Sequence, residues 1–479
     1  MRSRVVLPLL LLVTAGPTTV ALAQSPGTFT ATGKMTVPRS GHTATLLTNG
    51  KILVAGGYSD SGVVASAELY DPSTGVYTPT GDMITARSGH SAALLPDGKV
   101  LITQGTYWPS SYAELYDPAT GTFTITGGTT MVSGIVTLLK NGKVLITGNT
   151  AQLYDPITNS FAPTGSYVGP FYNGPFFWPD TATLLQDGRV LIVGNAAGDG
   201  NGYIEHEELY DPVTGVFKVT GKPHTFGFGS DIWSVHTATL LPNGKVLLAG
   251  GVSEDFGYFS IAELYDPSTD TFSATGNMTI ARAGHTATLL TDGTVLAAGG
   301  QLYSSLISAE LYNPATGAFS STGSMTIARV DHSATLLFDG RVLISGGAWG
   351  GGVLASDEIY TPAVLAPAPV LFSLSGDGRG QGAIWRSATG QITSSANPAT
   401  AGDVLSMYTT SLFEGGAIPP QVAVGSQLAE ILFFGDAPGY PGYYQVNFRV
   451  PSGIAPGLAV SVRLTYLGRQ SNEVTIGVR

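Results

Sequence analysis

Residues Gly284–Gly300, GHTATLLTDGTVLAAGG, form one of seven similar segments that decide the fold of this chain. The residue after the opening glycine, here His285, aligns in chain order with His42, His90, Gly134, Asp180, His236 and His332 in the other copies. Successive copies lie 44 to 56 residues apart. A period near about 50 residues indicates a propeller or a solenoid, in which each repeat is one unit of supersecondary structure. We number the units one to seven in chain order, so that Gly284–Gly300 belongs to unit six.

Each unit predicts four antiparallel strands, the composition of a propeller blade. A first strand such as HTATLL is followed in all seven units by Asn-Gly or Asp-Gly, which predicts a type I′ hairpin turn, and the second strand ends in glycine. The third strand contains ELYDP or a relative. Its Asp-Pro opens a turn closed by a residue that tolerates positive φ, such as Gly75, Asn159 or Asp270. The fourth strand resembles TFSATG of residues 271–276.

The seventh unit lacks a fourth strand of its own, because it runs directly into TPAVLAPAP at residues 361–369. The matching sequence, TFTATG at Thr28–Gly33, precedes unit one instead. We therefore expect Thr28–Gly33 to pair alongside Glu358–Tyr360 and to close a ring of seven blades. Closure would leave neither terminal blade with an exposed edge strand.

The repeats resemble the Kelch repeat in the form found in galactose-oxidase-type propellers. The resemblance rests on Arg39 with Gly41-His42, on the paired Gly56-Gly57 and on Glu68-Leu69-Tyr70-Asp71. It implies an all-β, seven-bladed Kelch-type β-propeller, and little about function, because one scaffold hosts many activities. The galactose-oxidase family uses a copper cofactor that needs a cysteine cross-linked to a tyrosine. This chain contains no cysteine, so we expect no such cofactor and commit to none.

The regions outside the repeats divide the chain further. Residues 1–23 resemble a cleaved signal peptide, with Arg2 and Arg4 before the apolar run Val5–Val13 and a small-residue cleavage site at Ala21-Leu22-Ala23, so we expect a secreted or periplasmic protein. The propeller then occupies residues 24–362, residues 363–369 form a linker, and short strands in residues 370–479 predict a small β-sandwich.

The carboxy-terminal run from Val446 to Gly457, with Ser471–Thr475, resembles an immunoglobulin-like domain that recurs on secreted proteins of some soil bacteria. That resemblance implies an accessory or adhesive module, and the alternative is a spacer or a stabilising cap. The formal net charge of −11 argues against a nucleic-acid or anionic-membrane partner, and no apolar stretch is long enough to span a membrane. We expect a monomer.

Functional residues are expected on one face of the ring. Because consecutive strands alternate in direction, the loops before strand one and between strands two and three share a face, and all variation in loop length falls there. Aromatic residues gather in these loops in units two to five, interleaved with Asn, Asp and Gly. The candidate ligand-binding residues are Trp108, Phe171, Tyr172, Phe177, Trp178, Asp180, Tyr203, His206, His224, Phe226, Asp231, Trp233, Phe256 and Tyr258. These rings either stack on a ligand or plug the channel and pack the loops.

The histidines and glutamates need separate interpretations. The five histidines at the aligned position recur in register, which favours a structural role in bonding to neighbouring backbone. The repeated glutamates, such as Glu68, are expected to pair with arginines that lie three residues before the aligned position. Four units contain this arginine, as Arg39, Arg87, Arg282 and Arg329, and in units three to five it is replaced by Met131, Phe177 and Trp233. His206 and His224 do not fit the repeat. Together with Asp180, Glu205 or Asp231 they could form a metal site, which is the alternative interpretation.

Three functions are therefore compatible with the sequence. The preferred hypothesis is an exported, non-catalytic protein that binds a glycan or a protein through the aromatic loops. The second is an extracellular carbohydrate-active enzyme, a hydrolase, lyase or metal-dependent oxidase, that uses His206, His224, Asp180 and Asp231. The third is a purely structural cell-surface module.

Overall fold

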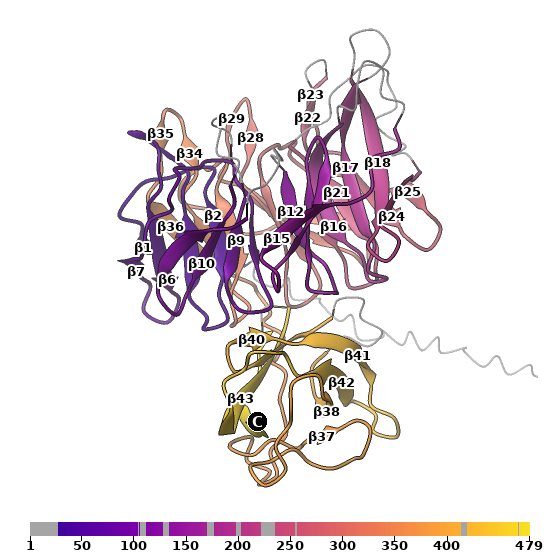
Figure 1. The fold of residues 1–479 in the computed structure, drawn as a ribbon. Helices are drawn as coiled ribbons and strands as arrows, with labels where there is room; N and C mark the ends of the chain where they lie inside the picture. The colour runs from indigo at the N-terminus through magenta and orange to yellow at the C-terminus, as the bar shows by residue number, and fades with distance from the viewer. Residues whose placement is uncertain are drawn as a thin grey trace, which may run out of the picture.

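The computed structural model describes residues 27–103, 105, 112–127, 134–169, 177–197, 203–221, 235–253, 256–412, 419–467 and 469–479. All regular elements in these ranges are β-strands, arranged in a larger amino-terminal part and a smaller carboxy-terminal part (Figure 1). Among these residues, no helix has the length and apolarity needed to cross a membrane.

The amino-terminal part contains seven four-stranded antiparallel sheets, one for each sequence unit. Units one to three are β2 (Thr43–Leu46), β3 (Ile52–Ala55), β6 (Ala67–Asp71) and β7 (Val76–Pro79); β8 (Ala92–Leu94), β9 (Val100–Ile102), β10 (Glu114–Asp117) and β11 (Thr122–Ile125); and β12 (Ile135–Leu138), β13 (Val144–Thr147), β14 (Ala151–Asp155) and β15 (Ser160–Pro163). Units four and five are β16 (Phe177–Leu184), β17 (Val190–Ala197), β18 (Tyr203–Asp211) and β19 (Val216–Val219); and β20 (Thr237–Leu240), β21 (Val246–Ala249), β24 (Ala262–Asp266) and β25 (Thr271–Ala274). Units six and seven are β26 (Thr286–Leu289), β27 (Val295–Ala298), β30 (Ala309–Asn313) and β31 (Ala318–Ser321); and β32 (Ser333–Leu336), β33 (Val342–Ser345), β36 (Ser356–Thr361) and β1 (Thr28–Lys34).

The amino-terminal strand β1 completes the last sheet. It lies antiparallel to β36, with Phe29 opposite Tyr360 and Ala31 opposite Glu358. The outermost strand of unit seven therefore comes from the start of the chain, and the backbone edge of β36 is paired.

Consecutive sheets pack face to face around a ring. The buried apolar residues form seven clusters in this part of the chain, and each cluster is built from two neighbouring units. One of them joins Ile52 and Val54 of unit one to Leu343 and Ile359 of unit seven. Every sheet thus buries both faces, which explains why the second strands, such as ILVA at β3, are apolar throughout.

The Asn-Gly and Asp-Gly turns adopt a different geometry from the predicted type I′ turn. Gly50 has a φ of 84°, but Asn49 is absent from the residues with positive φ, and a type I′ turn needs both. The amide of Gly50 bonds the carbonyl of Leu47, and that of Leu47 bonds the carbonyl of Lys51, which defines a three-residue loop with a glycine bulge. Oδ1 of Asn49 accepts the Lys51 amide at 3.0 Å, which stabilises the right-handed conformation of the asparagine.

The repeated histidines have the predicted structural role, and their Nε2 atoms also join neighbouring units through side-chain contacts. Nε2 of His285 in unit six lies 3.1 Å from Oγ1 of Thr237 in unit five. The same contact to the preceding unit is made by His42 with Ser333, His90 with Thr43, His236 with Thr181 and His332 with Thr286. Burial lowers the pKa of all five imidazoles to about 3, so they are neutral at physiological pH.

The predicted arginine–glutamate pairs are confirmed in all four units that contain the arginine. Arg39 donates to Glu68 at 2.9 Å and to the carbonyls of Gly56 and Ser66, and both charged side chains are buried. The equivalent pairs are Arg87–Glu114, Arg282–Glu310 and Arg329–Glu358. Each pair ties the loop before strand one to the third strand of its own unit.

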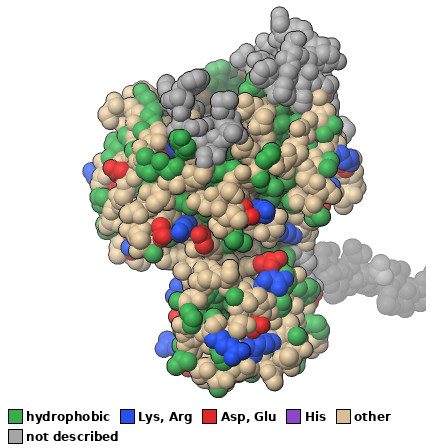
Figure 2. All heavy atoms as spheres, in the orientation of Figure 1, with side chains coloured by type: hydrophobic (Ala, Val, Ile, Leu, Met, Phe, Trp, Pro, Cys, Tyr) green, Lys and Arg blue, Asp and Glu red, His purple; other side chains and the backbone are tan. Residues whose placement is uncertain are grey.

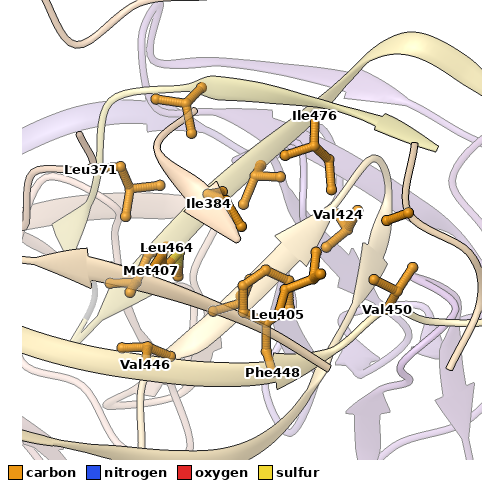
Figure 3. Packing of buried hydrophobic residues seen from close by; sticks show 14 of the residues in the cluster. Leu371, Ile384, Leu405, Met407, Val424, Val446, Phe448, Val450, Leu464 and Ile476 are labelled. Atoms are coloured by element: carbon orange, nitrogen blue, oxygen red, sulfur yellow. The ribbon is translucent and has the colours of Figure 1, made fainter. Parts of the chain in front are cut away.

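The carboxy-terminal part is a sandwich of two sheets. One sheet contains β37 (Ile384–Arg386), β38 (Val404–Thr409), β42 (Tyr444–Arg449) and β41 (Glu430–Asp436); the other contains β40 (Gln427–Leu428), β39 (Gln421–Val424), β43 (Gly457–Tyr466), β44 (Arg469–Gln470) and β45 (Val474–Val478). Figure 3 shows the core between them, where Leu405 and Phe448 from the first sheet meet Val424 and Leu464 from the second.

The neutral histidines predict how stability depends on pH. In the unfolded chain a histidine takes up a proton near pH 6.5, whereas in the fold it stays neutral to about pH 3, so its contribution to stability is present above pH 6.5 and is lost as the pH falls. When the pH is lowered from 7 to 4.5, the free energy of unfolding of the wild type is therefore expected to fall by roughly 2–3 kcal/mol more than that of the variant His285→Gln. Thermal unfolding at both pH values measures this difference, and parallel pH curves for the two proteins would contradict it.

The interface between units seven and one contains a buried polar network that is apolar at the interface between units one and two. Tyr77 donates to the carboxylate of Asp357, which also accepts from the Ser345 hydroxyl and the Gly346 amide, each at 3.0 Å. At the next interface the corresponding residues are Phe123, Ala67 and Ala55. Burial raises the pKa of Asp357 to about 6.

Replacing these three polar residues with the apolar residues of the next interface tests whether the polar network lowers the stability of the fold at high pH. In the fold the pKa of Asp357 is raised above its ordinary value of 3.8. The contribution of Asp357 to stability is therefore favourable below pH 3.8 and is lost as the pH rises through about 6. The triple variant Tyr77→Phe/Ser345→Ala/Asp357→Ala is expected to gain stability relative to the wild type from pH 4 to pH 7, by up to about 3 kcal/mol. Asp357→Ala alone is the control and is expected to destabilise by about 1–3 kcal/mol, because the Gly346 amide and the Tyr77 and Ser345 hydroxyls lose their buried carboxylate acceptor. A pH-independent difference between the triple variant and the wild type would be the contrary result.

Candidate functional site

The two faces of the propeller differ in what they carry. We call the face with the Asn-Gly and Asp-Pro turns the turn face and the opposite one the long-loop face. The carboxy-terminal sandwich lies below the turn face in Figure 1, and the amides of Leu428 and Gln470 bond the carbonyls of Pro96 and Phe338 in two of these turns. The long-loop face points away from the sandwich and is the candidate functional surface.

Short hairpins and extended strands build up the long-loop face. In units one, five, six and seven the loop between strands two and three forms a two-stranded hairpin: β4 (Tyr58–Ser59) with β5 (Gly62–Val63), β22 (Val252–Ser253) with β23 (Gly257–Tyr258), β28 (Gln301–Leu302) with β29 (Ser304–Ser305), and β34 (Ala348–Trp349) with β35 (Gly352–Val353). In unit four the main strands themselves are longer, and they project on the same side as the hairpins (Figure 1).

A chain of backbone hydrogen bonds holds the loops before strand one together. Gly89 donates to Gly41, Gly41 to Asp331, Asp331 to Gly284 and Gly284 to Val235, over distances of 2.8 to 3.4 Å. All five residues have φ between 53° and 61°, the left-handed region that favours glycine. Five of the seven units thus share one continuous rim.

Several predicted aromatic residues are displayed on this face. Trp178, at the start of β16 in unit four, is 43% exposed, and Phe256, at the tip of the unit-five hairpin, is 60% exposed. Tyr258 is half-buried, and its ring meets that of Tyr303 in unit six edge-on, with 5.5 Å between the centroids. The aromatic surface therefore runs across the boundary between units five and six.

Four exposed aromatic residues were not predicted: Tyr112 in unit two, which is 49% exposed, and three residues in the short hairpins. Tyr303 is 89% exposed and has a φ of 61°, an unfavourable conformation for a bulky side chain. Trp349, at the tip of the unit-seven hairpin, is 56% exposed, and Tyr58 occupies the unit-one hairpin. Most of the predicted residues lie in the longest loops, whereas Tyr58, Tyr303 and Trp349 follow paired glycines in short loops. An aromatic residue one to three positions after that glycine pair is the signal that would have found them.

Asp180 lies at a β-bulge, where a strand re-aims a side chain. Residues on either side of it, Pro179 and Thr181, pair with the adjacent Gly194 and Val193, so Asp180 is the extra residue of β16. Its carboxylate accepts a hydrogen bond of 2.9 Å from the amide of Asn195. Burial raises the pKa of Asp180 to about 7, so the carboxyl exchanges a proton near neutral pH, beside the exposed Trp178.

Phe177 and His206 lie in the interior, not on the ligand face. Phe177 is fully buried among the apolar residues shared by units three and four. His206 is buried and lies 2.6 Å from Oε1 of Glu208, the glutamate that pairs with arginine in other units. Phe177 replaces that arginine in unit four, and His206 supplies a polar partner from β18. We leave both residues out of the proposed site, because neither presents a free surface to a ligand.

The remaining predicted residues cannot be placed in full. Trp108, Phe171, Tyr172, His224, Phe226, Asp231 and Trp233 lie outside the described residues, and Tyr203 is described only as part of β18. Within the described ranges, no group of three or more His, Asp or Glu side chains is arranged to hold a metal ion.

The residues of this chain do not fit a galactose-oxidase-type copper cofactor. The sequence contains no cysteine for the required cross-link. Of its seven histidines, five bond hydroxyl groups between units and His206 bonds Glu208, which leaves His224. We therefore derive no reaction step through copper.

Comparisons with known proteins support the same fold. The Kelch motif family matches residues 38–84, which span unit one and the loop before unit two. No curated protein matches the chain in sequence. Among solved structures, the chain is similar to a novel fungal alcohol oxidase with catalytic diversity among the AA5 family, in complex with copper, at 18% identity and a TM-score of 0.58, over 95% of this chain and 100% of the oxidase.

These observations define the class of protein. The chain is an all-β protein that carries a Kelch motif and has a β-propeller of the galactose-oxidase type. At 18% identity, the similarity to the oxidase establishes the fold and not the activity.

The buried contact between His206 and Glu208 predicts that substitutions at these two positions have non-additive effects on stability. His206→Leu is expected to lower the free energy of unfolding by about 2 kcal/mol, because a buried carboxylate loses a hydrogen-bond partner. The double variant His206→Leu/Glu208→Gln should recover most of this loss, since unit three carries a neutral Gln152 at the equivalent position and no arginine. Denaturation of the three proteins at pH 7 tests the coupling, and a double variant no more stable than His206→Leu would argue against it.

Proposed function

We propose that this is an exported, non-catalytic protein whose propeller binds a glycan or a protein on the long-loop face. In this proposal the seven sheets are the blades of a closed propeller, the carboxy-terminal sandwich is immunoglobulin-like, and residues 1–23 direct export. The observation that carries it is the set of exposed rings on one face, with Trp178, Phe256 and Tyr303 on units four to six. Aromatic rings are costly to leave in water and are typical anchors of binding surfaces.

The surface chemistry supports a ligand of low charge. Only 11% of all residues are charged, and in the view of Figure 2 acidic and basic side chains on the propeller lie in small mixed groups. On the turn face these groups include Lys51 with Asp71 and Lys245 with Asp266. The long-loop hairpins contain rings, serines and glycines together with the acidic residues Asp60, Glu254 and Asp255, a composition suited to stacking on sugar rings and to bonding hydroxyl groups.

The alternative is a carbohydrate-active enzyme that uses Asp180. A carboxyl group whose pKa is raised to about 7 is suited to general acid or base catalysis near neutral pH, and it lies close in sequence to an exposed tryptophan. Turnover of a polysaccharide that disappears in Asp180→Asn would favour the enzyme over the binding protein.

Alanine substitution of the exposed rings tests the binding proposal. In a screen of polysaccharides and proteins, the variant Trp178→Ala/Phe256→Ala is expected to bind its ligand at least about tenfold more weakly than the wild type, because each ring contributes about 1 kcal/mol or more to stacking. Ile157→Ala and Val213→Ala are matched controls, since both side chains are about nine-tenths exposed on the turn face. Unchanged binding by the ring variant to every ligand found would refute the proposal.

A further inference from the structure

The carboxy-terminal sandwich carries an aromatic surface of its own. Alternation along the strands separates the side chains of its first sheet: Leu405 and Met407 of β38 belong to the core, so Ser406 and Tyr408 lie on the opposite, outer face. The same rule places Trp385 of β37 and Gln445 and Asn447 of β42 on that outer face, because Ile384, Val446 and Phe448 are core residues.

The strand register arranges these residues in two rows. Trp385 pairs with Ser406, Ser406 with Asn447 and Asn447 with Phe433, so one row crosses all four strands with a ring at each end. In the second row Tyr408 pairs with Gln445, and Gln445 with Gly435. The side chains of Gln445 and Asn447 thus lie among aromatic residues on one sheet face, whereas Ser406 is buried and its hydroxyl lies 2.6 Å from that of Ser387.

The rings form a connected surface. The centroids of Trp385 and Tyr408 are 4.9 Å apart, and those of Tyr408 and Tyr440 are 5.5 Å apart. Phe372 and Tyr443 form a further pair at 5.6 Å. Tyr440 is 56% exposed, and Phe433 and Tyr443 are also exposed. Leaving this much aromatic surface in water is unfavourable unless a ligand covers it.

The charge of the domain favours a neutral ligand. Residues 370–479 contain six arginines and six acidic residues and no lysine, so their formal charge is zero. The charged groups on the outer rows neutralise each other, since Arg449 lies 2.8 Å from Glu430. The polar groups left to a ligand are amides and hydroxyls, among them the amide of Gln445, which donates to Asn447 at 2.8 Å. Such groups match the hydroxyls of a sugar better than a phosphate or a carboxylate.

We propose that the outer face of the sheet β37–β38–β42–β41 is a second binding site, for a neutral polysaccharide. Sugar rings stack on Tyr440, Tyr408 and Phe433, and the side chains of Gln445 and Asn447 bond their hydroxyl groups. This site is on a different domain from the long-loop face and does not depend on the function proposed for the propeller. A chain with both sites would hold two glycan segments, or one glycan and another ligand, at once.

Affinity electrophoresis of the full-length mature protein tests this site. The gels contain a neutral glucan, mannan, xylan or galactan, with a polyuronate as the acidic probe. We expect at least one neutral polysaccharide to retard the protein, and we expect the variant Tyr440→Ala/Phe433→Ala to bind it about tenfold more weakly or not at all. Tyr440→Trp retains a ring and should retain binding. Leu458→Ala is the matched control, because Leu458 is exposed on the other sheet.

The outcomes separate this inference from the function proposed for the propeller. Loss of retardation in Tyr440→Ala/Phe433→Ala, with an unchanged melting temperature, supports the second site. The inference is overturned if no neutral polysaccharide retards the wild type, if only the polyuronate does, or if the double variant is retarded as strongly as the wild type. Retardation lost only in Trp178→Ala/Phe256→Ala also overturns it and assigns the glycan to the propeller.

Discussion

The pairing of β1 with β36 is the contact on which the rest of the structure depends. Every sheet of the propeller is apolar on both faces and needs a neighbour on each side, which an open row of sheets cannot provide at its ends. Joining the first strand of the chain to the last sheet closes the row and gives the first and last units a shared core. The contact of His42 with Ser333 and the bond from the Gly41 amide to the Asp331 carbonyl cross the same junction, so these two contacts depend on closure of the ring.

The buried arginine–glutamate pair is present in some units of the propeller and replaced in others. Four units keep an arginine–glutamate pair that fixes the loop before strand one. In unit three the arginine and the glutamate are both replaced, by Met131 and Gln152, and in unit four His206 bonds the remaining glutamate. A buried carboxylate needs a polar partner, which His206 supplies in unit four, whereas unit three replaces the carboxylate with a neutral amide. Unit four, which lacks the arginine, has the longest strands, and Asp180 and Trp178 lie in its first strand.

The two domains divide the surface of the protein between them. The sandwich covers part of the turn face through backbone bonds to Pro96 and Phe338, so the long-loop face is left for ligands. The outer sheet face around Tyr440 offers a second aromatic surface with a similar mixture of rings, amides and hydroxyls. The carboxy-terminal domain has no net formal charge, which is consistent with recognition there by stacking and hydrogen bonding more than by long-range attraction.

The sequence by itself determined the number of repeats, four strands in each, the strand shared between the chain ends, and the arginine–glutamate pairs. These features repeat in register along the chain, and local turn residues and strand periodicity encode them. The tertiary structure alone decided what each side chain touches. It assigned the histidines to hydroxyls of the preceding unit, buried Phe177 and His206, and exposed Tyr303 and Trp349. Burial depends on which units become neighbours and on how far each strand extends, and both are settled only when distant segments pack together.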